Sequence, residues 1–295
     1  MIRNYKGWRK LIVFALITVF ALSVVVGCAS QPADPGTEDK GTVKIGMVNW
    51  AECVAVSNLW QVILEDQGYT VELTQLDAAP VFTGLSTGDL DFFMDAWLPF
   101  THEAYWTEFG DDLEDFGIWY TEDAKIGLAV PTYVTIDSIG EMKGEAEKFD
   151  SQIIGIDPGA GIMKAAGNAN DSYDLGFEVV QGSEPAMMSA LEKAYGNEEW
   201  VAVTGWSPHM MFAKYELKYL DDPNGDFGSA EEIHTLANKD FSSNQPEVAA
   251  MLKKFKMSDT EIGGLTGMIA DGMEPADAAK QWIQENQAAV DSWIK

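Results

Sequence analysis

The chain has 295 residues, of which 46% are hydrophobic and 11% aromatic, so it is long enough to build the cores of about two domains. It contains 47 Asp and Glu against 19 Lys and Arg, a formal net charge of −28. This charge opposes binding to nucleic acids and to anionic membrane surfaces, so we expect no nucleic-acid partner. A cation, or a zwitterion whose charges cancel, is compatible with it.

The first 27 residues have the pattern of a secretory signal peptide. Four basic residues precede an apolar run over 11–26, which is too short for a confident membrane span. The ending Val25-Val26-Gly27-Cys28 resembles a bacterial lipobox, so we expect cleavage before Cys28 and a lipid on its sulfur. Residues 28–41 are polar, as in a flexible tether. The folded part is then extracytoplasmic and lipid-anchored to the cell membrane; an uncleaved anchor or an ordinary signal peptide is the alternative.

The hydrophobic pattern from Thr42 alternates between strand and helix periods. Strands are predicted at 43–48, 69–76 and 89–96, and helices at 51–66 and 79–86. This succession of strand, helix, strand, helix and strand is typical of a doubly wound α/β lobe.

A further helix is predicted at 101–109, and an apolar strand at 125–130 is interpreted as the crossover into a second lobe. The predicted elements of the second α/β unit are strands at 152–156, 177–181 and 200–204 and helices at 162–169 and 185–195. Residues 218–220 are expected to return the chain to the first lobe, and the remainder to be mostly helical, with helices at 246–255, 259–270 and 275–294. We therefore predict an α/β fold of two lobes, each a sheet flanked by helices. Lobe I comprises 42–127 and 216–295, and lobe II comprises 128–215.

Three tryptophans share one position relative to the predicted strands. Trp50, Trp97 and Trp206 each come at or just past a strand end, and His102 follows Trp97 by five residues. Taken alone, Trp97 could be a core residue and His102 a surface residue. Ligands of open α/β sheets bind at the carboxyl ends of strands, so the recurrence favours one shared cleft between two lobes.

Three indole rings in one cleft suit a quaternary ammonium group. Such a cation has no N–H to donate, but ring faces attract it by about 0.5 to 2 kcal/mol each when desolvated. An ordinary ammonium would keep unpaired donors in the same place, which gives discrimination as well as affinity.

A glycine-rich turn could hold the opposite charge of a zwitterion. Asp157-Pro-Gly-Ala-Gly161 lies between a predicted strand and a predicted helix, where backbone N–H groups can approach an anion. A plain tight turn is the simpler interpretation, and neither G-x-G-x-x-G nor the P-loop pattern is present. His102 could donate a further hydrogen bond to a carboxylate.

Enzyme chemistry finds little support in the sequence. The three histidines, His102, His209 and His234, lack the spacing of a metal site. The segment Thr204-Gly-Trp-Ser-Pro-His209 puts a serine near a histidine but is not the G-x-S-x-G elbow. Cys53 lacks the surroundings of a cysteine nucleophile. We therefore expect no catalytic residues, no metal and no cofactor; a secreted hydrolase remains the alternative, and turnover of the ligand would distinguish it.

Several motifs together resemble the glycine betaine and quaternary-amine substrate-binding proteins of bacterial ABC importers, of the OpuAC type. The matching strings are Ile45-Gly-Met-Val-Asn-Trp50-Ala-Glu, Asp95-Ala-Trp-Leu-Pro-Phe-Thr-His102, Gly155-Ile-Asp-Pro-Gly-Ala-Gly-Ile162, Thr204-Gly-Trp-Ser-Pro-His209 and Leu217-Lys-Tyr-Leu-Asp-Asp-Pro223. The resemblance covers the chain from about 42 to 295. It implies a type II periplasmic-binding-protein clam-shell that captures a betaine and presents it to an ABC permease.

The resemblance also implies roles for particular residues. The trimethylammonium is enclosed by Trp50, Trp97 and Trp206. The carboxylate is bound by His102 and by the backbone N–H groups of Gly161 and Ile162. Two residues, His209 and Asp157, are expected to support these contacts from behind. Choline or carnitine in place of glycine betaine is the alternative ligand, since residue spacing does not report the depth of the cleft.

Overall fold

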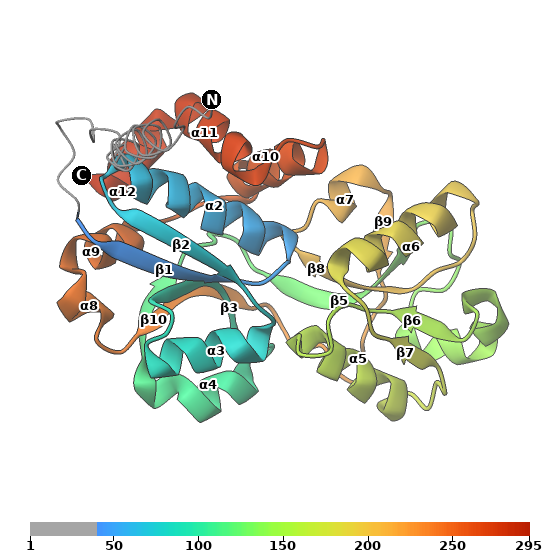
Figure 1. Cartoon of the computed structure of the whole chain (residues 1–295). Coiled ribbons are helices and arrows are strands. Elements are labelled where there is room, and N and C mark those ends of the chain that lie inside the picture. The colour runs from blue at the N-terminus through green and yellow to red at the C-terminus, as the bar shows by residue number, and fades with distance from the viewer. Residues whose placement is uncertain (1–39) are drawn as a thin grey trace, which may run out of the picture. The chain divides into compact units, whose positions relative to one another are not determined.

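The computed structural model describes residues Lys40 to Lys295, which form one compact unit (Figure 1). The expected signal peptide, Cys28 and nearly all of the tether lie outside the described residues. Within Lys40–Lys295, no helix is both long and apolar enough to cross a membrane.

Two five-stranded sheets organise this unit. The first has the strand order β2-β1-β3-β10-β4, in which β2, β1 and β3 run parallel and β10 pairs antiparallel with both β3 and β4. Its strands are β1 (Thr42–Met47), β2 (Thr70–Gln75), β3 (Phe92–Leu98), β4 (Leu113–Ile118) and β10 (Glu232–Asn238). Every residue of β3 is buried, as expected for a central strand covered on both faces.

The second sheet has the order β7-β6-β8-β5-β9, with β7, β6 and β8 parallel and β5 antiparallel to both β8 and β9. Its strands are β5 (Lys125–Pro131), β6 (Gln152–Ile154), β7 (Glu178–Val180), β8 (Val203–Ser207) and β9 (Leu217–Tyr219). Each sheet thus combines a parallel portion with one antiparallel strand in its interior.

Helices flank both sheets (Figure 1). Those of the first sheet are α2 (Ala51–Asp66), α3 (Ala78–Thr87), α4 (Glu103–Phe109), the 3-10 turn η1 (Gly110–Asp112), α8 (Phe241–Asn244), α9 (Pro246–Lys254), α10 (Asp259–Ala270), α11 (Pro275–Glu285) and α12 (Gln287–Ile294). Those of the second sheet are η2 (Ile139–Phe149), α5 (Gly161–Ser172), α6 (Glu184–Gly196) and α7 (Met211–Lys214). Helices α10 and α11 pack on α2, which itself covers β1, β2 and β3.

Two segments connect the sheets, one between β4 and β5 and the other between β9 and β10. They pair with each other where Ala124 and Glu231 exchange backbone hydrogen bonds of 2.9 and 2.8 Å. The Glu231 carboxylate is buried and accepts hydrogen bonds from the backbone N–H groups of Phe100 and Thr101. The connection therefore also fixes the loop that carries His102.

The predicted α/β class with two sheets flanked by helices is confirmed, but several local predictions are wrong. Residues 218–220 do not return the chain to the first sheet, because β9 pairs with β5 in the second. The predicted helix at 275–294 is two helices, α11 and α12, separated at Asn286. Strands β4 and β10 are not predicted from the sequence, because each depends on a partner far away in the chain. The lobe boundaries at 127/128 and 215/216 remain a proposal.

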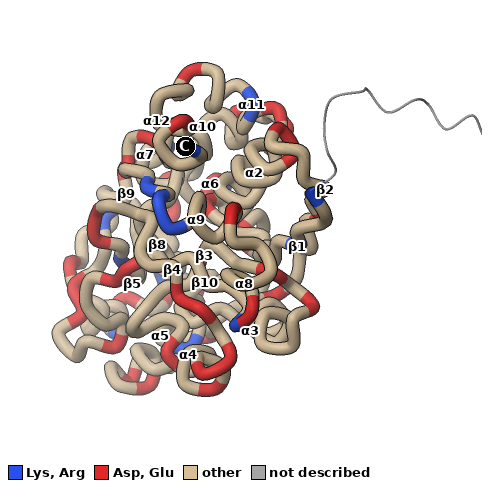
Figure 2. Tube along the Cα trace, turned by 90° about the vertical axis from the view of Figure 1, so that its left-hand side faces the viewer, with Lys and Arg blue, Asp and Glu red and all other residues tan. Residues whose placement is uncertain are grey.

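The fold rests on its apolar core rather than on surface charge. Trp60, Trp119 and Trp293 converge on Phe255, with ring centroids 4.8 to 5.4 Å apart. Along the chain trace, Asp and Glu outnumber Lys and Arg (Figure 2). Most lysine ion pairs are solvent-exposed, and such pairs contribute about 0 to 1 kcal/mol each.

Candidate ligand-binding site

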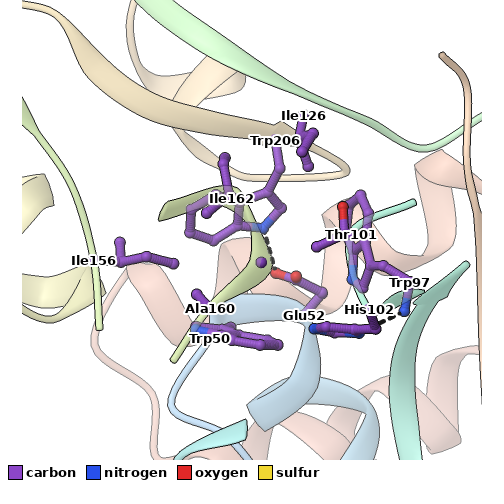
Figure 3. A pocket seen from close by; sticks show the side chains of 11 residues that line it. Trp50, Glu52, Trp97, Thr101, His102, Ile126, Ile156, Ala160, Ile162 and Trp206 are labelled. Carbon is purple, nitrogen blue, oxygen red and sulfur yellow. Dashed lines mark hydrogen bonds between the residues drawn. The ribbon is translucent and has the colours of Figure 1, made fainter. Parts of the chain in front are cut away.

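Residues from both sheets and their flanking elements line one cavity of about 30 Å³ (Figure 3). Trp50 precedes α2, Trp97 lies in β3, and Trp206 lies in β8. The lining consists of Trp50, Glu52, Trp97, Thr101, His102, Ile126, Ile156, Ala160, Gly161, Ile162 and Trp206. All six residues predicted to contact the ligand are therefore brought together. Trp97 and Trp206 lie within their strands rather than past the strand ends.

Each of the three cavity tryptophans donates its indole N–H to a carboxylate. The three pairs, each with a nitrogen to oxygen distance of 2.9 Å, are Trp50 with Asp157, Trp97 with Asp95, and Trp206 with Glu52. The indoles are 3 to 5% exposed. Because their only polar group is already paired, what the rings offer the cavity is apolar surface and π-electron density.

Two of these hydrogen bonds connect the elements of the first sheet to the elements of the second sheet. The Trp50 indole, beside the first sheet, reaches Asp157 in the loop after β6. Glu52 on α2 reaches the Trp206 indole in β8, as Figure 3 shows. The Tyr105 hydroxyl on α4 adds a third, to the Gly159 carbonyl at 2.8 Å. The walls of the cavity are complete only while the two sets of elements are in contact.

His102 presents a single N–H group to the cavity. Its Nδ1 accepts the backbone N–H of Trp97 at 2.9 Å, so the proton of the neutral ring is on Nε2. Nε2 is buried and has no hydrogen-bond partner among the described residues. Burial lowers the pKa of His102 to about 3, so the ring is neutral at ordinary pH. An unpaired buried donor costs about 1 to 3 kcal/mol, which an acceptor on a ligand would recover.

The start of helix α5 lies beside this histidine. Gly161 and Ile162 are its first residues, and the N–H groups of a first turn have no acceptor within the helix. No side chain caps this turn. A Cβ on Gly161 would lie 2.0 Å from the Thr101 carbonyl oxygen, so only glycine allows the helix to approach the His102 loop this closely.

Carboxylates surround the three indoles. Burial, reinforced by the charges of Asp95 and Glu184, raises the pKa of Glu52 well above its ordinary value. Burial also raises the pKa of Asp95 to about 7, against the hydrogen bond from the Trp97 indole. One Asp95 oxygen is buried and has no hydrogen-bond partner among the described residues. A cation in the cavity would favour the ionised form of both groups.

Asp157 and His209, which were expected to support the ligand-contacting residues, do not line the cavity. Asp157 holds the Trp50 indole, and burial raises its pKa. The His209 side chain is fully buried and meets the Trp206 ring edge to face, with centroids 4.4 Å apart. His209 also contacts the Glu184 carboxylate.

Three carboxylates, Glu52, Asp95 and Glu184, were not predicted from the sequence to take part in the site. Asp95 carried a signal, because an acid inside a strand as apolar as β3 is rarely buried without a purpose. Glu52 follows Trp50 by two residues, but its meeting with Trp206 spans 154 positions and has no local signature. Among the described residues, no group of three or more His, Cys, Asp and Glu is arranged to hold a metal ion.

The family OpuAC, described as the substrate binding domain of the ABC-type glycine betaine transport system, matches residues 41–285. The chain belongs to this family. The structure of lactococcal OpuAC in its closed conformation with glycine betaine is similar, with a TM-score of 0.82 and 36% identity over 86% of this chain and 100% of the other. A choline-binding protein of an ABC transporter, in complex with choline, has a TM-score of 0.80 and 28% identity over 86% of this chain and 91% of its own.

A further relative is named for carnitine as well as for glycine betaine. The glycine betaine/carnitine transport binding protein GbuC of Listeria monocytogenes is 38% identical over 154 residues, a match that spans 51% of each chain. As an OpuAC member, this protein is a substrate-binding protein of ABC transporters for betaine-type ligands, a class that works outside the cytoplasm and is not an enzyme class.

Proposed function

We propose that this protein captures glycine betaine, or a close analogue, in the cavity between Trp50, Trp97 and Trp206 and delivers it to its ABC permease. One observation carries the proposal. The same cavity joins three indoles, whose N–H groups are all held by carboxylates, to a histidine with one unpaired N–H. These features suit the two ends of a betaine.

The cation end relies on ring faces and on the charge behind them. A trimethylammonium group has no N–H to donate to an acceptor, but each indole face can contribute about 0.5 to 2 kcal/mol of attraction. Hydrogen bonding of each indole N–H to a carboxylate makes the ring richer in electrons. The Glu52 carboxylate, which also lines the cavity, adds direct attraction when ionised.

The carboxylate end relies on N–H donors. His102 supplies Nε2–H, and the first turn of α5 supplies the backbone N–H groups of Gly161 and Ile162 together with the positive end of the helix dipole. Because His102 is neutral, its hydrogen bond does not depend on pH above about 4.

Choline is the second candidate ligand, because a choline complex is among the similar structures and Glu52 lines the cavity. Choline has a hydroxyl in place of the carboxylate. It would therefore leave the N–H donors of His102 and Gly161 without an anion to bind. Carnitine keeps both charged groups at a greater separation, and the relative GbuC is named for it.

The two lobes, each built around one of the two sheets, are proposed to close around the ligand, because the lining of the cavity comes from both sheets. We also propose that the protein is held at the membrane by lipid on Cys28 through the tether 28–41. The mass of the peptide that begins at Cys28, isolated from membranes, tests the anchor: an unmodified thiol would contradict it.

Calorimetry of the full chain with glycine betaine, proline betaine, carnitine and choline tests the ligand assignment. We expect saturable binding of one glycine betaine per chain and weaker binding of choline. Absence of saturable binding for all four compounds would refute the proposed function. Tighter binding of choline than of glycine betaine would refute the role given to His102 and leave the indole enclosure intact.

A further inference from the structure

Helix α2 begins without a cap from its own neighbourhood. Its N-cap residue is Trp50, which offers no side-chain acceptor, although helices usually begin with Ser, Thr, Asp or Asn at this position. The backbone N–H of Ala51, the first helical residue, donates instead to Glu184 Oε2 at 2.8 Å. Glu184 is 133 positions away and begins α6, which flanks the second sheet. A helix that flanks the first sheet is thus capped by a carboxylate from a helix that flanks the second sheet.

Glu184 is itself held in place by His209. His209 Nδ1 accepts the backbone N–H of Met211 at 2.9 Å, so Nε2 carries the proton and donates to Glu184 Oε1 at 3.0 Å. The His209 side chain is fully buried and the Glu184 side chain is 10% exposed. One carboxylate oxygen is therefore fixed within the half of the molecule that is built on the second sheet. The other oxygen reaches across to α2, in the half that is built on the first sheet.

The cap lies at the centre of the contact between the two halves. Three consecutive residues on the α2 side each bond to a different residue of the second half. The three bonds are Trp50 to Asp157, Ala51 to Glu184 and Glu52 to Trp206. The first and third hold walls of the cavity, whereas Glu184 does not line it. Glu184 can therefore hold the halves together without touching the ligand.

We propose that Glu184, positioned by His209, is a closing latch that sets how long the ligand stays bound. A carboxylate at a helix N-terminus gains from the helix dipole and forms a charge-assisted hydrogen bond. Separation of the halves breaks this bond and returns the Ala51 N–H and the carboxylate to water. The latch is independent of the ligand's identity and rests on the proposed function only for the ligand used in its test.

Ligand dissociation from Glu184→Ala, followed by tryptophan fluorescence in a stopped-flow experiment, tests the latch. We expect the dissociation rate to rise about tenfold while the association rate changes less, because affinity differences between variants of one complex lie mostly in the dissociation rate. Glu192→Ala is the matched control: it removes a solvent-exposed carboxylate from the same helix and should leave both rates unchanged. A wild-type dissociation rate in Glu184→Ala would overturn the proposal.

Two further variants separate positioning from general structural damage. In Glu184→Gln the amide can accept from only one of its two partners, so dissociation should again accelerate although the side chain keeps its shape. His209→Ala should accelerate dissociation to a similar degree, and the double variant Glu184→Ala/His209→Ala should add little to either change. Fully additive effects of the two substitutions would overturn the role of His209.

Amide hydrogen exchange at Ala51 tests the latch without any ligand. In the full chain, exchange of the Ala51 N–H should be faster in Glu184→Ala than in wild type, while the interior of α2 stays protected. If no compound of the calorimetric panel bound, the proposed function would fail and this measurement would still decide the latch. Unchanged exchange at Ala51 would contradict the latch even in a protein that binds glycine betaine.

Discussion

The tryptophans and His102 line the same cavity, and the Trp50 ring stacks on the His102 ring with centroids 5.8 Å apart, but the two sets of side chains differ in which polar atoms lack a partner. Every indole N–H of the three tryptophans is paired with a carboxylate, and among the described residues one oxygen of Asp95 and one of Asp157 accept no hydrogen bond. The Nε2–H of His102 has no partner among the same residues. The tryptophans are thus backed by surplus acceptors, whereas His102 offers a surplus donor. A ligand that carries both a cation and an anion suits this combination.

The largest expected effect comes from the contact that joins the two halves beside His102. Gly161→Ala should lower the affinity for glycine betaine roughly a hundredfold, because the new Cβ cannot coexist with the Thr101 carbonyl and the halves cannot approach. Gly159→Ala, in the same loop, places its Cβ at an ordinary 3.7 Å from the Tyr105 hydroxyl and serves as control. Calorimetry of both variants decides, and equal affinities would mean that the close approach at Gly161 is not needed.

Removal of one indole ring from the cavity should lower the affinity for every cationic ligand to a similar degree. Trp97→Ala should lower the affinities for glycine betaine and choline roughly thirtyfold each, since both lose the same ring face. Trp106→Ala, which removes a partly buried indole outside the cavity lining, is the control. Binding of a betaine by Trp97→Ala as tightly as by wild type would refute the indole enclosure.

Removal of the histidine should instead separate the two ligands. His102→Ala should lower the affinity for glycine betaine about tenfold, because a charged acceptor loses a donor, and should change that for choline far less. The two ligands control for each other, since any loss of packing or of the bond to the Trp97 backbone affects both. An equal loss for both compounds would assign His102 a purely structural role.

The smallest expected effect is a pH dependence of ligand affinity, which arises from Asp95 beside the Trp97 indole. The pKa of Asp95 is about 7 and a bound cation lowers it, so binding releases a proton below pH 7. The affinity for choline should therefore rise a few-fold as the pH increases from about 5.5 to 7. Asp95→Asn should reduce this slope, and the slope that remains belongs to Glu52, whose pKa is also raised by burial. His102, with a pKa of about 3, contributes nothing in this range, so a wild-type profile without slope would show that Asp95 is not coupled to the cation.

Strands β3 and β10 show where prediction from sequence succeeds and where it stops. The apolar run around Phe92 and Phe93 indicates a buried strand by itself. The segment Glu232–Asn238 mixes charged and apolar residues, and it becomes a strand because β3 and β4 leave a place between them. Its partners precede it by more than a hundred positions, so no local pattern reports the pairing.

The candidate site divides in the same way. Trp50, Trp97 and Trp206 could be picked out because each comes at or near the end of an apolar strand, and Gly161 because glycines precede a helix. The positions of strand ends and helix starts are local properties, so the sequence by itself determined which rings and which turn could face a cleft.

Only the tertiary structure decided which polar groups pair with those rings. Trp50 meets Asp157 across 107 positions, Ala51 meets Glu184 across 133, and Glu52 meets Trp206 across 154. Asp157 was expected near the site only through the family resemblance, and with 47 acidic residues in the chain nothing local separates Glu52 and Glu184 from the solvated majority. A carboxylate acquires its partner and its burial only when two distant segments exclude water between them, and that event is a property of the fold.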